Sequence, residues 1–233
     1  VGALLSNSAR YCLPYELTIA ATEVAVTNGV EFLRNCEVKA IKKENDVYEL
    51  DTTLGTIEAE YIINAAGNHS DEVAKMIGDD SIELIARKGE YYLLDKSFGY
   101  LANHTIFQCP NKMGKGVLVT PTVDGNLLIG PSATDEPDKD DTDTTPEGLE
   151  FVVSRALKSV KAVNLRGAIT SFAGVRAHPV TDDLLSAIRI RAISSSTVQV
   201  SSLPVFRLLL LSQSMLKSFC LKSFRLTKRL ITR

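Results

Sequence analysis

Hydrophobic and polar positions change their spacing several times along this chain, and the changes mark predicted elements. Pro14 and Glu16 suit the first turn of a helix that runs to residue 28, and Gly29 suits its end. A short strand is expected at 30–33. The segments 37–43, 47–51 and 56–58 alternate apolar and polar residues, which predicts a three-stranded meander.

The segment 61–78 predicts a buried strand, a sharp turn and a helix. Tyr61, Ile62 and Ile63 favour a strand, and the small residues that follow let another body approach the backbone; they are Ala65, Ala66 and Gly67. Ser70 and Asp71 can cap a helix with an apolar face of Val73, Met76 and Ile77. Such a unit can hold a phosphate or nucleotide, and it also occurs as an ordinary connection without a ligand.

The second half of the chain predicts a mainly antiparallel sheet. A long strand pair or one bent strand is expected at 82–95, and further strands at 104–109, 116–123 and 126–132, with turns at 111–114 and at Asp124-Gly125. The segment 146–161 predicts an amphipathic helix with five inward residues, Leu149, Val152, Val153, Ala156 and Val160. A further strand, 165–176, is expected to end in a glycine and an arginine. The fold class is therefore α/β or α+β.

No metal site is predicted from the spacing of ligand-type residues. The acidic segment 136–146 lacks the spacing of a calcium loop, so a solvated loop is favoured over a cation site. His69, His104 and His178 also lack metal-ligand spacing. Of the three, His178 is the candidate base because it follows Arg176 closely, with a surface or core role as the alternative.

Composition narrows the class of protein. The chain has 233 residues, 45% of them hydrophobic, which is enough for a core, and its net charge of −2 favours neither nucleic acid nor membrane. The four cysteines form no CxxC pair, so a reduced, cytoplasmic protein is expected. No apolar run reaches the length of about 18 residues that a membrane-spanning helix needs.

The charge is divided unevenly between two parts of the chain. Residues 1–183 contain all 28 acidic residues and 17 of the 26 basic ones, for a net charge of −11. Residues 184–233 contain nine Lys or Arg, ten Ser and no Asp, Glu or Gly. A globular segment of that length rarely lacks glycine and acidic residues altogether. The composition therefore indicates that the two parts did not evolve together as one protein sequence.

Six segments of residues 1–183 occur in the order found in one family: PYELTIAATEVAVTNGVEF, NCEV, YIINAAG with Asp71, RKGEYYLLDK, KGVLVTPTVDGNLLIGPSA and ITSFAGVRA. They resemble the FAD-dependent D-amino-acid-oxidase superfamily, in its glycerol-3-phosphate dehydrogenase-like and L-2-hydroxyglutarate oxidase-like branch. The resemblance implies a Rossmann-type FAD domain interrupted by a substrate domain with a large antiparallel sheet. It assigns 15–80 and 172–183 to the FAD domain, and 1–14 and 81–171 to the substrate domain.

The resemblance also implies roles for residues. Val38 would contact the adenine through its backbone, and Gly174 would pass close to the flavin ring. The small residues of the turn would line the cofactor; they are Ala65, Ala66 and Gly67. Arg176 would grip an anionic substrate, which suits a guanidinium that can form two charge-assisted bonds to a carboxylate or phosphate. A surface ion pair is the alternative for this arginine.

Tyr91 departs from the family pattern. It matches a position that holds an active-site histidine in glycerol-phosphate dehydrogenases, and this departure counts against glycerol phosphate as the substrate. A tyrosine still supplies a hydroxyl for hydrogen bonding, although it is a much weaker base at neutral pH. Lys88 and Glu90, in the same motif, are expected to form a structural pair.

Two features of the family are missing from the sequence. No GxGxxG occurs, which predicts that an N-terminal part precedes Val1. The family segment of the type FINxAGIxSPGLxxSPAIA should follow Asp183 and is replaced by SSSTVQVSSLPVFR and the residues after it. Plausible codons for that stretch, read one base earlier, translate as FINCAGIQSPGLS, so we expect a frameshift near Asp183-Leu184. The alternative is a true basic helix at 208–233 that binds a membrane surface or a partner.

The resulting expectation is a FAD enzyme that oxidises a small anionic hydroxy acid or polyol phosphate. Arg176 would hold the anion and Tyr91 would help to place the hydroxyl, while a quinone or a partner subunit would accept the electrons. Amino-acid oxidation is the alternative within the same class. Two further alternatives are an inactive fragment or remnant of such an enzyme, and a binding module that uses the basic tail.

Overall fold

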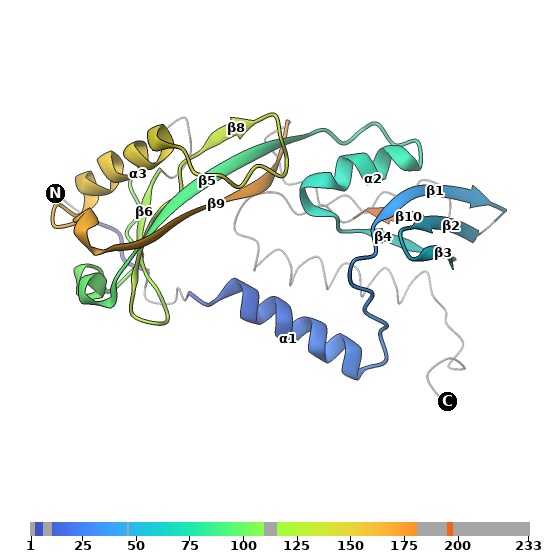
Figure 1. The fold of residues 1–233 in the computed structure, drawn as a ribbon, viewed down its shortest axis with the longest axis horizontal. Helices are drawn as coiled ribbons and strands as arrows, with labels where there is room; N and C mark the ends of the chain where they lie inside the picture. Colours follow the sequence, from blue (N-terminus) through green and yellow to red (C-terminus); the bar gives the residue numbers. More distant parts are fainter. Residues whose placement is uncertain (1–2, 7–10, 46, 110–115, 181–194, 198–233) are drawn as a thin grey trace. The chain divides into compact units, whose positions relative to one another are not determined.

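The computed structural model describes residues 3–6, 11–45, 47–109, 116–180 and 195–197 (Figure 1). The chain divides into two compact units. The first comprises Val1–Asn35, Lys88–Thr134 and Asp140–Gly174, and the second comprises Cys36–Arg87, Asp135–Lys139 and Val175–Arg233. The divisions fall within two long strands, β5 (Leu84–Leu94) and β9 (Ala168–Pro179). The predicted domain boundaries at 80 and 171 stay predictions.

An antiparallel sheet confirms the expectation for the second half of the chain. Its strands β6 (Leu118–Pro121), β7 (Leu127–Gly130), β5 and β8 (Thr134–Glu136) lie in the order β6-β7-β5-β8, and β9 also pairs with β5. Leu93 of β5 lies opposite Leu128 of β7, and β6 pairs antiparallel with β7. The predicted turn at Asp124-Gly125 is present, and Gly125 has a φ of +86°.

The amphipathic helix is confirmed as α3 (Pro146–Ser159), with Val152 and Ala156 fully buried. These two side chains join an apolar cluster that fills the first unit, with Leu94, Ala102, Val117, Val119, Leu127, Ile129 and Val163. Val153 and Val160 pack against the cluster as partly buried residues. The helix ends at Ser159, because Val160 already has an extended backbone (φ −135°, ψ 99°).

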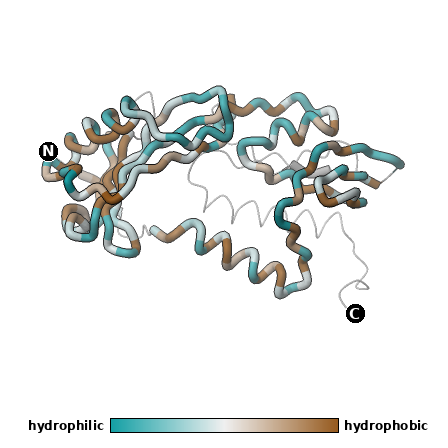
Figure 2. Tube along the Cα trace, in the orientation of Figure 1, coloured by the Kyte–Doolittle hydropathy of each residue, from teal (hydrophilic) through white to brown (hydrophobic). Residues whose placement is uncertain are grey.

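The first predicted helix is confirmed as α1 (Pro14–Thr27), but the strand predicted at 30–33 is wrong. Gly29, with φ +90°, donates its N–H to Val26 O, and Val30 donates to Ala25 O. These two bonds form a Schellman motif. The N–H of Val30 therefore caps the C-terminus of α1 and does not begin a strand. Hydrophobic positions are spread along α1 in Figure 2, and none of its residues is buried.

The second unit contains the predicted meander. Strands β1 (Val38–Glu44), β2 (Val47–Thr52) and β3 (Gly55–Ala59) form an antiparallel sheet in the order β1-β2-β3. A separate strand, β4 (Ile62–Asn64), pairs in parallel with β10 (Ser195–Thr197). A 3₁₀ turn, η1 (Gly67–His69), then leads directly into α2 (Ser70–Met76).

Details of the strand–turn–helix unit differ from expectation. Ile63 of β4 is 57% exposed, whereas Asn64 is buried, so the strand is not a buried apolar one. His69 takes the N-cap position of α2 with no side-chain cap bond, and Ser70 and Asp71 are buried inside the first turn. The 3₁₀ turn explains this, because the N–H of Ser70 already bonds to Gly67 O. The buried residue of the apolar face is Ala74, and Ile77 is exposed.

Other strand predictions also change. The residues 104–109 make an isolated bridge, Ile106 to Val119, and no regular strand. Within the segment 82–95, residues 84–94 form one long strand, β5, and β9 runs three residues past Arg176 to Pro179. The turn predicted at 111–114 and most of the tail, 184–194 and 198–233, lie outside the described residues.

Among the described residues, no helix has the length and apolar character needed to cross a membrane. Cys12, Cys36 and Cys109 are free thiols.

Candidate functional site

The turn after β4 presents backbone to its surroundings. Ala65, Ala66 and Gly67 are exposed, and a Cβ placed on Gly67 would meet no atom within 4 Å in the part of the chain that the structure describes. Gly67 has a φ of +59°, a conformation that glycine adopts without strain. Asn64 shapes the turn: its Oδ1 accepts from Ala66 N (3.2 Å) and its Nδ2 donates to Ser70 O (2.7 Å). The result is an open stretch of backbone that a flat ligand can approach.

Asn68 links this turn to two distant segments. Its Nδ2 donates to Val175 O at 3.2 Å and to Lys139 O at 3.4 Å. Val175 belongs to β9 and directly precedes Arg176. The structure therefore brings the predicted cofactor turn, 65–67, beside the strand that carries the predicted substrate arginine.

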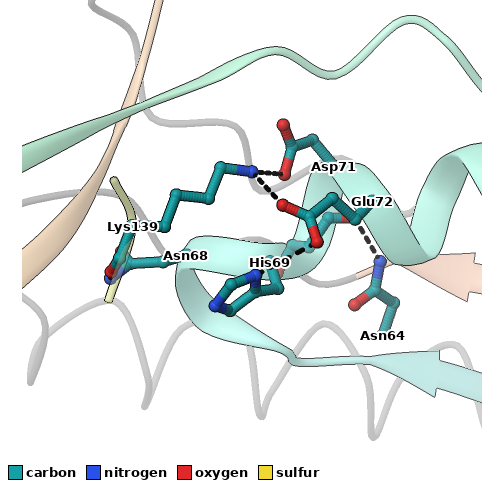
Figure 3. Close-up of polar contacts among 7 residues, drawn as sticks. Asn64, Asn68, His69, Asp71, Glu72 and Lys139 are labelled. Carbon is teal, nitrogen blue, oxygen red and sulfur yellow. Dashed lines mark hydrogen bonds and ion pairs between the residues drawn. The ribbon is translucent and has the colours of Figure 1, made fainter. Parts of the chain in front are cut away.

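A charged cluster surrounds the start of α2 (Figure 3). Lys139 Nζ lies 2.6 Å from Asp71 Oδ1 and 2.7 Å from Glu72 Oε1, and Glu72 Oε2 lies 3.1 Å from His69 Nδ1. The hydrogen bond from Lys139, and then that from His69, lowers the pKa of Glu72. Burial acts to lower the pKa of Lys139, but its bonds to Asp71 and Glu72 prevail and raise it.

The acidic segment 136–146 thus takes part in ion pairs in the folded chain. Besides the bonds of Lys139, Asp141 Oδ2 lies 2.8 Å from Nζ of the buried Lys88. Within the part of the chain that the structure describes, no group of three or more Cys, His, Asp or Glu side chains is arranged to hold a metal ion.

Arg176 and His178 lie on the part of β9 that belongs to the second unit. Successive side chains of a strand point to opposite faces, so these two share one face, and Ala177 on the other packs with Ala74, Ile82 and Leu84. Arg176 is half-buried and His178 is buried. Arg87 holds the pKa of Asp135 below its ordinary value through bonds of 2.6 and 3.0 Å, with smaller effects from the charges of His178 and Arg176.

Tyr91 and Gly174 belong to the first unit. The Tyr91 ring stacks on Phe172, with 5.2 Å between centroids and 13° between planes. Gly130 lies against the same ring, because a Cβ on Gly130 would come 2.4 Å from Tyr91 Cδ1. Gly174 is exposed, and a Cβ there would meet no atom of the described residues within 4 Å. Phe172 was missed by the sequence analysis, although its position two residues before Gly174 places both on one face of β9.

The structure also describes Val38 and the two charged residues Lys88 and Glu90, to which the sequence analysis assigned roles. Val38 is half-buried at the start of β1, opposite Thr52. The expected pairing of Lys88 with Glu90 stays a prediction, while Glu90 Oε2 accepts from Ser132 Oγ (3.1 Å) and Oε1 accepts from Thr145 Oγ1 (2.9 Å). Both residues are buried, at 2% and 1% exposed, so the structural role expected of them is retained.

Comparison with known proteins decides the family. The family model described as "FAD dependent oxidoreductase" matches residues 1–194, most of the chain. The chain belongs to this family of FAD-dependent oxidoreductases. The resemblance inferred from the six sequence segments is thereby confirmed, and FAD is the cofactor of the family.

Three relatives show which branch of the FAD-dependent oxidoreductases is involved. A glycerol 3-phosphate dehydrogenase of Caloramator mitchellensis is 48% identical over 184 residues, which are 79% of this chain and 38% of that protein. An L-2-hydroxyglutarate dehydrogenase of Escherichia coli is 28% identical over 122 residues, 51% of this chain and 29% of its own length. The FAD-bound L-α-glycerophosphate oxidase of Mycoplasma pneumoniae is 26% identical, with a TM-score of 0.76 over 89% of this chain and 55% of the other.

The chain therefore spans between about one third and just over one half of these relatives. The residues present still fit the cofactor of the family at two places. Gly67 and Gly174 are both exposed glycines with open space where a side chain would be, so a flat ring system can lie against the backbone at each.

Proposed function

We propose that the protein is a FAD-dependent enzyme that oxidises a small anionic substrate at a CH–OH group, with glycerol 3-phosphate as the substrate. The observation that carries this proposal is the 48% identity to a glycerol 3-phosphate dehydrogenase across four fifths of the chain. L-2-hydroxyglutarate is the alternative, supported by the match to the dehydrogenase for that compound and by Tyr91 in place of the family histidine. Both compounds carry an anionic group and a secondary alcohol.

Arg176 is the proposed anchor for the anion. A guanidinium can offer two parallel N–H donors to a phosphate or a carboxylate, and its charge persists at any relevant pH. Its half-buried position strengthens such a bond, because water competes less for the donors. Its backbone lies beside the 65–67 turn through the Asn68–Val175 bond.

Proton transfer and orientation fall to His178 and Tyr91 in this proposal. His178 shares a strand face with Arg176, and a neutral imidazole can take the proton of the substrate hydroxyl. The Tyr91 ring stacks on Phe172 and also lies against Gly130, so its hydroxyl has a defined direction for a hydrogen bond. FAD, when bound, supplies the acceptor of the hydride. The proposed FAD contacts are Val38, Ala65, Ala66, Gly67 and Gly174.

We also propose a cytoplasmic, reduced setting, and a quinone or a partner subunit as electron acceptor. The cysteine pattern supports the first of these, because it contains no CxxC pair. The second rests on the family resemblance alone.

The proposal is tested by the steady-state oxidation of glycerol 3-phosphate by the FAD-loaded protein and its Arg176→Lys variant. Lysine keeps the charge and loses the paired donors, so we expect KM to rise about 10- to 100-fold with a smaller change in kcat. Arg166→Lys is the matched control, because Arg166 is exposed in a 3₁₀ turn of the first unit, and it should leave KM unchanged. An unchanged KM in Arg176→Lys would remove Arg176 from the anion site.

A further inference from the structure

Asn68 makes contacts that the proposed mechanism does not use. Its side-chain NH₂ group donates to the backbone carbonyls of Lys139 and Val175, which are 71 and 107 residues away in the sequence. An amide NH₂ has two donors, so both are taken by these carbonyls. The preceding residue, Gly67, ends the turn that is proposed to line FAD.

We propose that Asn68 is a positioning residue that sets the place of Arg176 relative to the cofactor turn. The inference rests on the proposed function of Arg176. The peptide group between Val175 and Arg176 is planar, so a bond that holds Val175 O also orients the N–H and the Cα of Arg176. The bond from Asn68 to Val175 O thereby fixes the backbone N–H and Cα of Arg176 relative to the turn that begins at Ala65.

The second acceptor of Asn68 is itself anchored. Lys139, whose carbonyl accepts one of the two bonds, places its ammonium group between Asp71 and Glu72 at 2.6 and 2.7 Å (Figure 3). These two carboxylates belong to the first turn of α2, which follows Asn68 by three and four residues. Asn68 is therefore bonded to Lys139, and Lys139 is bonded in turn to the first turn of α2, which directly follows the Asn68 turn. These contacts fix the Asn68 side chain, so it cannot easily move together with β9.

This geometry predicts a specific effect on anion binding. Asn68→Leu keeps a similar volume and removes both donors. Loss of these two bonds gives the Arg176 backbone more freedom, so phosphate and glycerol 3-phosphate should bind about three- to tenfold more weakly. The effect acts through Arg176, so it should largely disappear when Arg176 is already replaced by lysine.

The experiment is a double-mutant cycle read by isothermal titration calorimetry. Inorganic phosphate, and separately glycerol 3-phosphate, is titrated into the oxidised FAD-loaded protein, its Asn68→Leu and Arg176→Lys variants, and the double variant. Phosphate undergoes no oxidation, so its titration reports binding alone. Asn126→Leu is the matched control, because it removes a 3.0 Å bond from another asparagine amide to a backbone carbonyl, that of Leu94 in the first unit.

The outcomes separate the inference from the proposed function. A loss of phosphate affinity in Asn68→Leu that is absent in the Arg176→Lys background supports the positioning role. An equal loss in both backgrounds, or none in either, overturns it. If Arg176→Lys alone leaves phosphate affinity unchanged, the proposed role of Arg176 has failed first.

A second variant distinguishes a folding defect from the loss of the positioning role. If Asn68→Leu loses its cooperative thermal transition, Asn68→Asp replaces it in the cycle, since a carboxylate of the same shape cannot donate to either carbonyl. Loss of the cooperative transition in both variants would show that Asn68 serves folding, and this too would overturn the positioning role.

Discussion

At the residue scale, the charged cluster of Lys139 shows how one side chain connects segments that lie far apart in the sequence. Lys139 is 18% exposed and bonds to the buried carboxylate of Asp71 and the half-exposed one of Glu72. Removing the ammonium leaves the Asp71 charge without this bond in a site with little water. Such a loss typically destabilises a fold by about 1–3 kcal/mol.

Lys139→Met should therefore lower the free energy of unfolding at neutral pH, and the difference from the parent should shrink in acid. The folded-state pKa of Glu72 lies below its reference value of 4.5, so its contribution is present above that pH and is lost as pH falls through the folded-state pKa. Urea unfolding at about pH 7 and at a series of pH values from about 4 down to about 2 measures the two free energies of unfolding and their difference. Lys158→Met, an exposed lysine of α3, is the control. A difference that is equal at all of these pH values would contradict the ion-pair account.

Two contacts at this scale could not be predicted from the sequence. The bond from Asn68 to Val175 depends on segments 107 residues apart meeting in space, and nothing in the pattern around Asn68 signals it. The spacing of Phe172 from Gly174 weakly indicated that both lie on one face of a strand. Its stacking on Tyr91 depends on the pairing of β9 with β5, which the local sequence does not reveal. Arg176 was singled out because it ends a local G-x-R motif, and its role in binding an anion stays a prediction.

At the element scale, the N-terminus of α3 is built around a buried carboxylate. Glu90 accepts from the N–H and the hydroxyl of Thr145, the N-cap residue of α3, and from Ser132 Oγ. A Cβ on Gly148 would lie 1.4 Å from Glu90 Oε2, so this glycine gives the carboxylate its room. The partial positive charge of a helix N-terminus also favours a carboxylate there.

Gly148→Ala should therefore destabilise the fold by about 1–3 kcal/mol, although alanine is the better helix former by about 1 kcal/mol. The reason is that Glu90 must move and give up buried hydrogen bonds. The change is measured by the urea midpoint. An unchanged urea midpoint in Gly148→Ala would mean that Glu90 can shift freely. That result would contradict the tight packing of Glu90 against the start of α3.

Gly174→Ala serves as the control for Gly148→Ala and as a prediction of its own. Among the described residues, a Cβ at Gly174 meets no atom within 4 Å, so stability should stay within about 0.5 kcal/mol of the parent. If the flavin lies against this backbone, the added methyl should weaken FAD binding, measured by the quenching of flavin fluorescence on titration. Unchanged FAD affinity would remove Gly174 from the proposed cofactor site.

Elements with a strong periodic pattern were predicted well, and those decided by local hydrogen bonds were not. The meander and α3 follow directly from the alternation of apolar residues and from the spacing of Leu149, Val152 and Ala156. The strand expected at 30–33 failed because the N–H of Val30 closes the end of α1. The expected caps of α2 failed because the N–H of Ser70 already bonds to Gly67 O at the end of the 3₁₀ turn Gly67–His69.

At the scale of the whole molecule, the order of the six segments carried more information than any one of them. It predicted the family, the cofactor of the family and an antiparallel sheet in the second half, and each of these is confirmed. The domain boundaries placed at 80 and 171 stay predictions, and the two compact units of the structure divide β5 after Arg87 and β9 after Gly174. A division within a strand leaves no trace in hydropathy, because the same alternation continues across it.

The central claim is that the protein oxidises glycerol 3-phosphate with FAD, and anaerobic reduction of the bound flavin tests it most directly. Glycerol 3-phosphate, L-2-hydroxyglutarate and glycine are mixed in turn with the FAD-loaded protein without oxygen, and the visible absorbance of oxidised flavin is followed. The account predicts rapid bleaching by glycerol 3-phosphate, slower bleaching by L-2-hydroxyglutarate and none by glycine. Bleaching by glycine alone, or by none of the three, would contradict it.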